Sequence, residues 1–300
     1  MLKIAYHPIF RHNLPLGHRF PMSKYELLHD QLLHEGTCVE ANFFSPSQSA
    51  DEAVLAVHSE SYVNDLRNLT LDKRAARKIG FPLSEALVTR EYVITQGTIE
   101  GCDHALTHGI AMNIAGGTHH AYPDHGEAFC LFNDQAIAAR YLLQNQKAKK
   151  ILLVDLDVHQ GNGTAVIFQD DLLVFTFSMH GEGNYPFRKE KSDLDIPLPD
   201  GTTDEVYLSA LQETLPKLIE DQQPDFIFYL SGVDILESDK LGRLNCTLEG
   251  CKARDRYVLQ TCKTYNIPLQ ISMGGGYSPD IKTIIDAHAN TFRLAQELFF

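Results

Sequence analysis

The sequence predicts an α/β domain with a central, mainly parallel sheet, because strand-like and helix-like segments alternate along most of its 300 residues. Short apolar runs of this kind are typical of buried parallel strands, and they occur at Leu2–Tyr6, Ile110–Ile114, Ile151–Asp155, Leu173–Ser178, Phe226–Leu230 and Leu269–Ser272. Helical periodicity occurs between most of them, at Asn133–Gln146, Asp204–Glu220, Leu248–Tyr265 and Pro279–Leu298. This alternation predicts a sheet covered by helices on both faces.

The expected helices carry recognisable local signals. Asp204–Glu220 places apolar residues at helical spacing, for example Leu208, Leu211 and Leu215. For the last helix we expect Ser278 as the N-cap and Pro279 at the first helical position. The first hundred residues are more helical and less regular than the rest. No repeat or low-complexity segment divides the chain, so residues 1–300 are expected to form a single domain.

Composition and charge exclude several classes of protein. Hydrophobic residues make up 44% of the chain, which is enough for a sizeable core. The formal net charge is -13, so the field around the protein repels phosphate backbones, and nucleic acid is not expected as a direct partner. A cationic substrate, such as a lysine-rich tail, would be attracted by the same field.

The cysteines and the N-terminus point to a soluble, cytoplasmic protein. No two cysteines form a CxxC pair, so a thiolate zinc site is not expected, and the six lie at positions 38, 102, 130, 246, 251 and 262. They are typical of reduced, buried side chains. No apolar segment approaches the roughly 20 residues that span a bilayer, and no signal peptide is evident. The oligomeric state is left open.

Polar clusters follow the expected strands, where ligands bind in parallel sheets. In an extended segment Asp155, Asp157 and His159 point the same way. Two carboxylates and an imidazole together are costly unless a cation lies among them, and zinc accepts such ligands. One Asp-x-His alone is more often a solvated turn. Asp234, which ends the apolar run from Phe226, supplies the third carboxylate that favours a metal site.

Two glycine-rich motifs also follow strands. Gly116–Ala121 reads GGTHHA, and its adjacent His119 and His120 could form a proton-transfer pair. Gly274–Tyr277 reads GGGY, a turn that could bring the Tyr277 hydroxyl to a developing oxyanion. Taken alone, each motif is more often an ordinary loop, so the argument depends on their occurring together.

Taken together, these motifs resemble the zinc-dependent histone deacetylase family over nearly the whole chain. The motifs occur in the order GGTHHA, FCLFND, DLDVHQGNGT, SGVDILESDKLG and GGGY. The HQGNG and DILESDKLG segments look most like the class IV branch and its bacterial relatives. The resemblance implies the three-layer α/β/α arginase–deacetylase fold, in agreement with the alternation described above.

The resemblance also implies roles for individual residues. Asp157, His159 and Asp234 would bind Zn²⁺. His120 would exchange protons with the attacking water and the leaving amine, His119 would give electrostatic support, and Tyr277 would polarise the carbonyl. Residues implied around them are Asp155 and Asn162 beside the histidines, Phe129, Tyr185, Leu241 and Arg19 for the substrate, and Asp155, Asp157, His159, Ser178 and Met179 for a structural K⁺ site.

Two positions depart from common family patterns. Asn162 stands where class I members have aspartate, which indicates the branch and does not argue against activity. Ala128 precedes Phe129 where many members have glycine, so we expect a slightly narrower or differently shaped substrate tunnel there.

The implied activity is zinc-dependent hydrolysis of the amide bond of acylated lysine in a protein or peptide. An acetylated polyamine or another small amide is the alternative substrate. Family members that prefer acetylpolyamines carry an acidic residue seven positions after the last zinc ligand, and this chain has Leu241 there. The class IV resemblance implies cleavage of long fatty acyl chains. A zinc-binding pseudoenzyme is less favoured, because every catalytic position is filled, and an arginase-like two-manganese site would need more acidic ligands.

Overall fold

The computed structural model describes all 300 residues and contains one sheet of eight strands in the order β2-β1-β3-β8-β7-β4-β5-β6. Every neighbouring pair is parallel. The strands are β1 (Lys3–Ala5), β2 (Phe43–Phe44), β3 (Ile110–Asn113), β4 (Ile151–Asp155), β5 (Val174–Gly181), β6 (Leu194–Leu198), β7 (Phe226–Leu230) and β8 (Leu269–Ser272). The predicted parallel sheet is confirmed.

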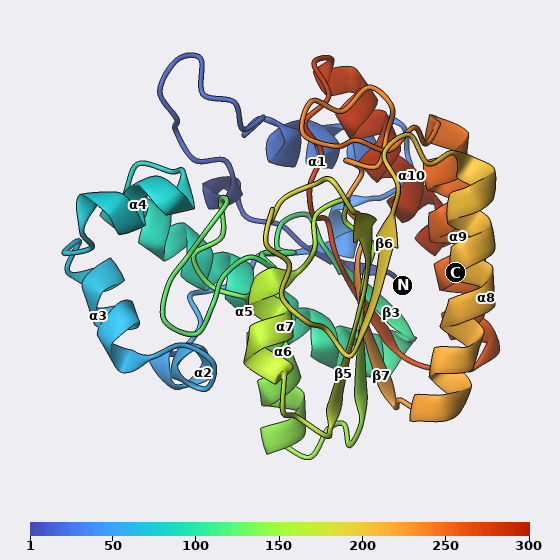
Figure 1. Ribbon diagram of the computed structural model, residues 1–300, viewed down its shortest axis with the longest axis horizontal. Helices are drawn as coiled ribbons and strands as arrows, with labels where there is room; N and C mark the ends of the chain where they lie inside the picture. The colour runs from blue at the N-terminus through green and yellow to red at the C-terminus, as the bar shows by residue number, and fades with distance from the viewer.

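Helices cover both faces of the sheet. Figure 1 shows α5 (Glu85–His108), α6 (Asp134–Gln144) and α7 (Asn162–Phe168) on one side. On the other side it shows α8 (Asp204–Gln222), α9 (Leu248–Thr264) and α10 (Ile281–Phe299), with α1 (Lys24–His34) beside α10. The short α2 (Asp51–Leu55), α3 (Glu60–Arg67) and α4 (Lys73–Ile79) extend beyond α5. No helix combines the length and hydropathy that crossing a membrane requires.

The central strands are buried on both faces, and most of their side chains are apolar. Every residue of β3, β4, β7 and β8 is buried, and one cluster of 77 buried hydrophobic residues runs through the molecule. The strands β3, β8, β7, β4 and β5 are consecutive in the sheet and parallel. Their carboxyl ends therefore meet at one edge, which carries the candidate site.

The last helix begins later than the sequence predicts. Asp280 is the N-cap of α10, and its side chain accepts a hydrogen bond from the backbone of Lys282. The hydroxyl of Ser278, the expected cap, lies 2.8 Å from the hydroxyl of Ser238 instead. Ser278 and Pro279 therefore belong to the loop that leads into the helix, and the prediction of the helix start was wrong by two residues.

Candidate active site and metal centre

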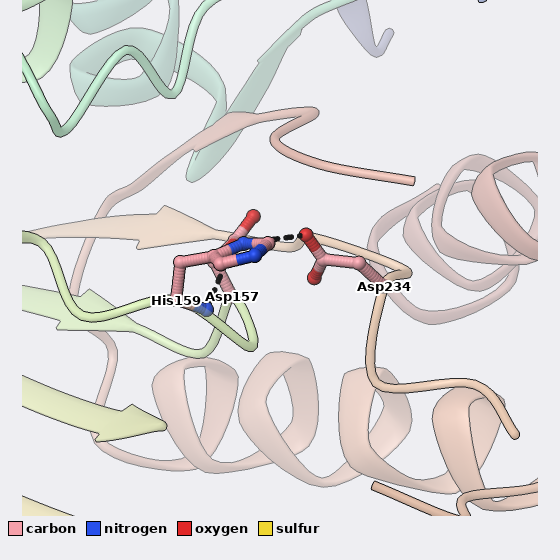
Figure 2. Close-up of side chains that lie close together, drawn as sticks. All are labelled: Asp157, His159 and Asp234. Carbon is pink, nitrogen blue, oxygen red and sulfur yellow. Dashed lines mark hydrogen bonds and ion pairs between the residues drawn. The ribbon is translucent and has the colours of Figure 1, made fainter. Parts of the chain in front are cut away.

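Two carboxylates and one imidazole converge just after the carboxyl ends of β4 and β7. Asp157 and His159 follow β4, Asp234 follows β7, and one ligand atom of each lies within 4.8 Å of the others. His159 Nδ1 is 3.0 Å from Asp157 Oδ1 and 3.2 Å from Asp234 Oδ2 (Figure 2). All three residues are buried. The pairing of β4 with β7, in which Asp155 is opposite Leu230, is what brings the two loops together.

The cluster has the chemistry of a metal site. Asp234 Oδ2 is buried and, apart from its 3.2 Å ion-pair contact with His159 Nδ1, accepts no hydrogen bond, whereas its other oxygen accepts from the backbone of Val158 at 3.0 Å. An orphaned carboxylate oxygen is expensive to bury, and a bound cation would remove that cost. Two carboxylates and one imidazole fit zinc with a further position left open. The residues present therefore fit the metal.

Glycines let the neighbouring loops approach these carboxylates. The backbone of Gly275 donates a hydrogen bond of 2.8 Å to Asp157 Oδ2. A Cβ atom at Gly275 would lie 2.0 Å from Asp234 Oδ2, and one at Gly232 would lie 2.3 Å from Asp157 Oδ2. Any larger residue at either position would displace a carboxylate, so both glycines are needed for the cluster.

The histidine pair lies on the loop after β3. Asp134 at the start of α6 fixes this loop, because its Oδ1 accepts from the backbone and the hydroxyl of Thr118 at 2.9 and 2.8 Å. His119 Nδ1 is 2.6 Å from Asp155 Oδ2, and His120 Nδ1 is 2.6 Å from Asn162 Oδ1. Each imidazole thus has its own acceptor behind it.

The two histidines differ in their electrostatics. Burial lowers the pKa of His119, but the carboxylate of Asp155 outweighs burial and raises that pKa above its usual value. Burial lowers the pKa of His120 well below its usual value, and the neighbouring His119 and His159 add to this effect. Of the two, His120 therefore loses its proton more readily, which leaves one of its ring nitrogens open to accept a proton.

The acceptor of His120 is held in turn by a tyrosine. Asn162 Nδ2 donates to the hydroxyl of Tyr122 at 3.0 Å, and that hydroxyl donates to Glu190 at 3.2 Å. The chain of contacts runs from the buried imidazole to a carboxylate at the surface. Sequence reasoning did not identify Tyr122.

Tyr277 stands beside the cluster. Its backbone donates to Asp239 Oδ2 at 2.6 Å, and its ring lies 6.4 Å from the ring of His159. Its hydroxyl has no hydrogen-bond partner within the protein, so it is free to donate to a substrate. Lys24 is fully buried behind it and donates from Nζ to the carbonyl of Gly274 at 3.0 Å.

Two cavities meet at these residues. The outer one, about 320 Å³, opens to the surface and is lined by Phe129, Tyr185 and Leu241 together with His120, His159 and Tyr277. The inner one, about 40 Å³, lies beyond the histidines and is lined by residues that include Phe20, Tyr25 and Arg90. Ala128 lines both cavities, and its backbone has φ +44°, a left-handed conformation that favours glycine.

Arg19 does not lie where the resemblance implies. It is exposed and lines the outer cavity, with its guanidinium 5.0 Å from the centre of the Phe129 ring. The cations buried on the inner side are Lys24 and Arg90. The expectation of Arg19 in an internal channel was therefore wrong, because the chain between Gly17 and Lys24 turns inward only after Arg19.

The residues expected to bind K⁺ lie on β4, on β5 and on the loop that follows β4. Asp155 of β4 is opposite Ser178 of β5, and Met179 follows Ser178. The Ser178 hydroxyl lies 2.9 Å from His180 Nδ1. The K⁺ site remains a prediction.

Comparison with known proteins assigns the family. A model of the histone deacetylase domain matches residues 18–292. Histone deacetylase 2 of Arabidopsis thaliana is 30% identical over 286 residues, which cover 92% of this chain and 74% of that protein. An uncharacterized protein of Picosynechococcus sp. is 45% identical over 297 residues, which cover 99% of each chain. The chain belongs to the histone deacetylase family.

Solved structures agree with this assignment. A histone deacetylase homologue from Aquifex aeolicus superposes with a TM-score of 0.82 at 25% identity, covering 97% of this chain and 82% of that one. The HD domain of HDA15 gives a TM-score of 0.80 at 20% identity, covering 96% of this chain and 89% of the other. The three-layer α/β/α arginase–deacetylase fold is thus confirmed, and the chain is a hydrolase of the deacetylase family.

Proposed function

We propose that this protein is a zinc-dependent deacetylase that hydrolyses the amide bond of an acylated lysine side chain. The observation that carries the proposal is the convergence on one cavity of a metal-binding cluster, an oriented histidine and a free tyrosine hydroxyl. Asp157, His159 and Asp234 would hold the metal. When bound there, zinc supplies a Lewis acid for the substrate carbonyl and lowers the pKa of a water molecule.

The protein's own side chains account for the remaining chemistry. His120 keeps its proton on Nδ1, which donates to Asn162, so Nε2 can accept a proton from water and return it to the leaving amine. The Tyr277 hydroxyl donates to the oxygen on which negative charge develops. His119, paired with Asp155 and lying beside His120 with 4.1 Å between the ring centres, gives electrostatic support.

The inner cavity favours a short acyl group. Its volume of about 40 Å³ is far below the roughly 150 Å³ cavity that accommodates a benzene molecule. An acetyl group needs little more than this space, whereas a fatty acyl chain would require Phe20 and Tyr25 to move. We therefore favour acetyl-lysine over long-chain acyl-lysine, in contrast to what the class IV resemblance implies.

The outer cavity favours a lysine side chain over a polyamine. Leu241 offers an apolar contact to an alkyl stem, and the cationic side chains that line the cavity are Arg19, Lys78 and Arg243. A free polyamine ammonium would meet positive charge there and no carboxylate from the lining residues. Acetylpolyamines remain the second candidate, because the chain's net charge of -13 attracts polycations from a distance.

The proposal is tested by substituting Asp234 with alanine. Since Asp234 brings the ligand from β7, Asp234→Ala is expected to lose most bound zinc, measured by elemental analysis, and most acetyl-lysine peptide hydrolysis. Asp124→Ala, which removes an exposed carboxylate outside the cluster, is the control and should retain both. Full zinc occupancy and turnover in Asp234→Ala would contradict the assignment, as would a zinc-loaded wild-type protein that hydrolyses acetylpolyamines but no acetyl-lysine peptide.

A further inference from the structure

The entrance to the outer cavity has a charge opposite to that of the whole molecule. Its lining includes Arg19, Lys78 and Arg243 and no aspartate or glutamate, although the chain as a whole carries a net charge of -13. The same cavity reaches His120 and Tyr277. When the acyl group of a substrate reaches His120 and Tyr277, the part of the substrate outside the cavity therefore lies beside the three cationic side chains.

Arg19 is the cation available to a ligand. It is exposed and forms no ion pair with any residue of the chain. Its guanidinium lies 5.0 Å from the centre of the Phe129 ring, on the wall of the cavity. A stacked guanidinium keeps its planar N–H edge free for a carboxylate, which it can bind through two parallel hydrogen bonds.

Lys78 and Arg243 are paired, Lys78 with the half-buried Glu127 and Arg243 with the exposed Asp200. Lys78 Nζ lies 2.8 Å from Glu127 Oε1, and Arg243 Nη1 lies 3.2 Å from Asp200 Oδ2. Glu127 also interacts with His125 and Tyr185, and these hydrogen bonds, with that from His125 the largest contribution, lower its pKa to about 2. The three cationic side chains outnumber the carboxylates of Glu127 and Asp200 by one, so the entrance keeps one net positive charge. The exposed Arg243–Asp200 pair contributes little to stability, so Arg243 can also interact with a ligand.

Apolar surface lies between the cations. Phe187, which is 86% exposed, and Leu241 line the same cavity. A peptide backbone and aliphatic side chains can pack there while acidic side chains reach the rim. Nucleic acid fits less well, because the overall negative charge repels a polyphosphate at long range.

We propose that the entrance binds an acidic peptide segment, so that the preferred substrate carries aspartate or glutamate next to the acyl-lysine. This proposal rests on the deacetylase function proposed above and adds the chemical class of the sequence around the modified lysine. It differs from the lysine-rich tail that the net charge alone suggests, since contacts at the entrance act at short range, where screening is weak.

The test compares three acetyl-lysine peptides that differ only in having glutamate, glutamine or lysine on both sides of the modified residue. At about 0.15 M salt we expect kcat/KM for the glutamate peptide to exceed that of the glutamine peptide by roughly tenfold, the factor that one charge-assisted hydrogen bond supplies. Arg19→Gln should remove most of this difference, so that the ratio of kcat/KM between the glutamate and glutamine peptides falls toward one. Arg11→Gln, whose partner Glu26 lies outside the cavity, is the control and should keep the preference.

The outcomes separate the two proposals. Equal kcat/KM for the glutamate and glutamine peptides, or a preference for the lysine peptide, would overturn the acidic-segment proposal while leaving the deacetylase function intact. If no peptide is hydrolysed, the deacetylase proposal fails, and fluorescence anisotropy of the same labelled peptides still tests the entrance. Tighter binding of the glutamate peptide that depends on Arg19 supports the proposal, and its absence overturns it.

Discussion

The side-chain amide of Asn162 has an acceptor oxygen and a donor nitrogen, and both form hydrogen bonds in the candidate site. Its oxygen accepts from His120 Nδ1 at 2.6 Å, and its nitrogen donates to the Tyr122 hydroxyl at 3.0 Å. A flipped amide would present N–H to His120 and place the imidazole proton on Nε2, where it would block proton uptake. The Tyr122 hydroxyl donates its proton to Glu190, so toward Asn162 it can only accept a hydrogen bond. It therefore favours the amide orientation in which the nitrogen of Asn162 faces Tyr122 and the oxygen faces His120. It therefore acts as a positioning residue.

Tyr122→Phe is expected to lower kcat several-fold, because about 1 kcal/mol of orientation is lost with one hydrogen bond. The effect should largely disappear in an Asn162→Asp background, since a carboxylate presents an acceptor oxygen in either orientation. The measurement is kcat for the wild type, the two single variants and the double variant. An equal loss from Tyr122→Phe in both backgrounds would show that Tyr122 acts through general packing.

The residues that the sequence could identify are those whose chemistry is local. Asp157 and His159 are two positions apart, and Asp234 closely follows β7, so their convergence follows from the strand pattern. Lys24 could not be found in this way, because its contact with Gly274 spans 250 positions and depends on how α1 packs. Tyr122 contacts Asn162 across 40 positions, and nothing in its local sequence marks the contact.

At the scale of elements, the central strands were predictable and the edge strands were not. The strands β4 and β7 are continuous apolar runs, whereas β2 has only two residues, Phe43–Phe44. The other edge strand, β6, contains Pro197, which cannot donate to a ladder and is typical of edges. Both edges depend on a single neighbouring strand for their pairing, so their own sequences carry a weak signal.

One ion pair joins the first helix to the last. Glu35, the C-cap of α1, is bound by the guanidinium of Arg293 on α10, at 2.9 Å between Oε1 and Nε. Burial would raise the pKa of Glu35, but the hydrogen bonds from Arg293, Thr37 and Gln31 outweigh burial and lower it to about 2. A depressed carboxyl pKa stabilises the fold above the usual value of 4.5, and this stability is lost as the pH falls toward 2.

Glu35→Gln is therefore expected to lower the free energy of unfolding at neutral pH, by at most about 1 kcal/mol for a partly exposed pair. The difference from the wild type should shrink as the pH falls from the usual carboxyl pKa toward about 2. Denaturant unfolding at several pH values measures it. As a control, Glu297→Gln on α10 removes the more exposed partner of Arg256 on α9 and should have a smaller effect. A Glu35→Gln deficit that does not depend on pH would argue against the ion pair.

At the scale of the whole molecule, charge acts over two distances. The net charge of -13 attracts any polycation from afar, while the entrance around Leu241 offers an acetylpolyamine no carboxylate from its lining. Long-range attraction weakens as salt shortens the screening length from about 10 Å at 0.1 M to about 3 Å at 1 M. The two effects can therefore be separated by ionic strength.

Leu241→Glu is expected to raise kcat/KM for acetylspermidine by roughly tenfold, because it supplies a carboxylate to the free ammonium groups. The gain should persist at high salt, whereas the wild-type activity on acetylspermidine should decline. Leu241→Gln, of similar shape but without charge, is the control. No gain from Leu241→Glu at any salt concentration would show that this position does not select the substrate.

The metal cluster also has a consequence for how the protein folds. Its ligands come from the ends of β4 and β7, which are neighbours in a fixed register, Asp155 opposite Leu230. A slip of one residue would turn the side chains of one strand to the other face and separate Asp234 from its partners. A cation that bridges the three residues therefore binds only the correctly assembled sheet, and mass action adds its binding energy to the native state alone. A cation bound at the proposed metal site would thus stabilise only the correct pairing of the two central strands.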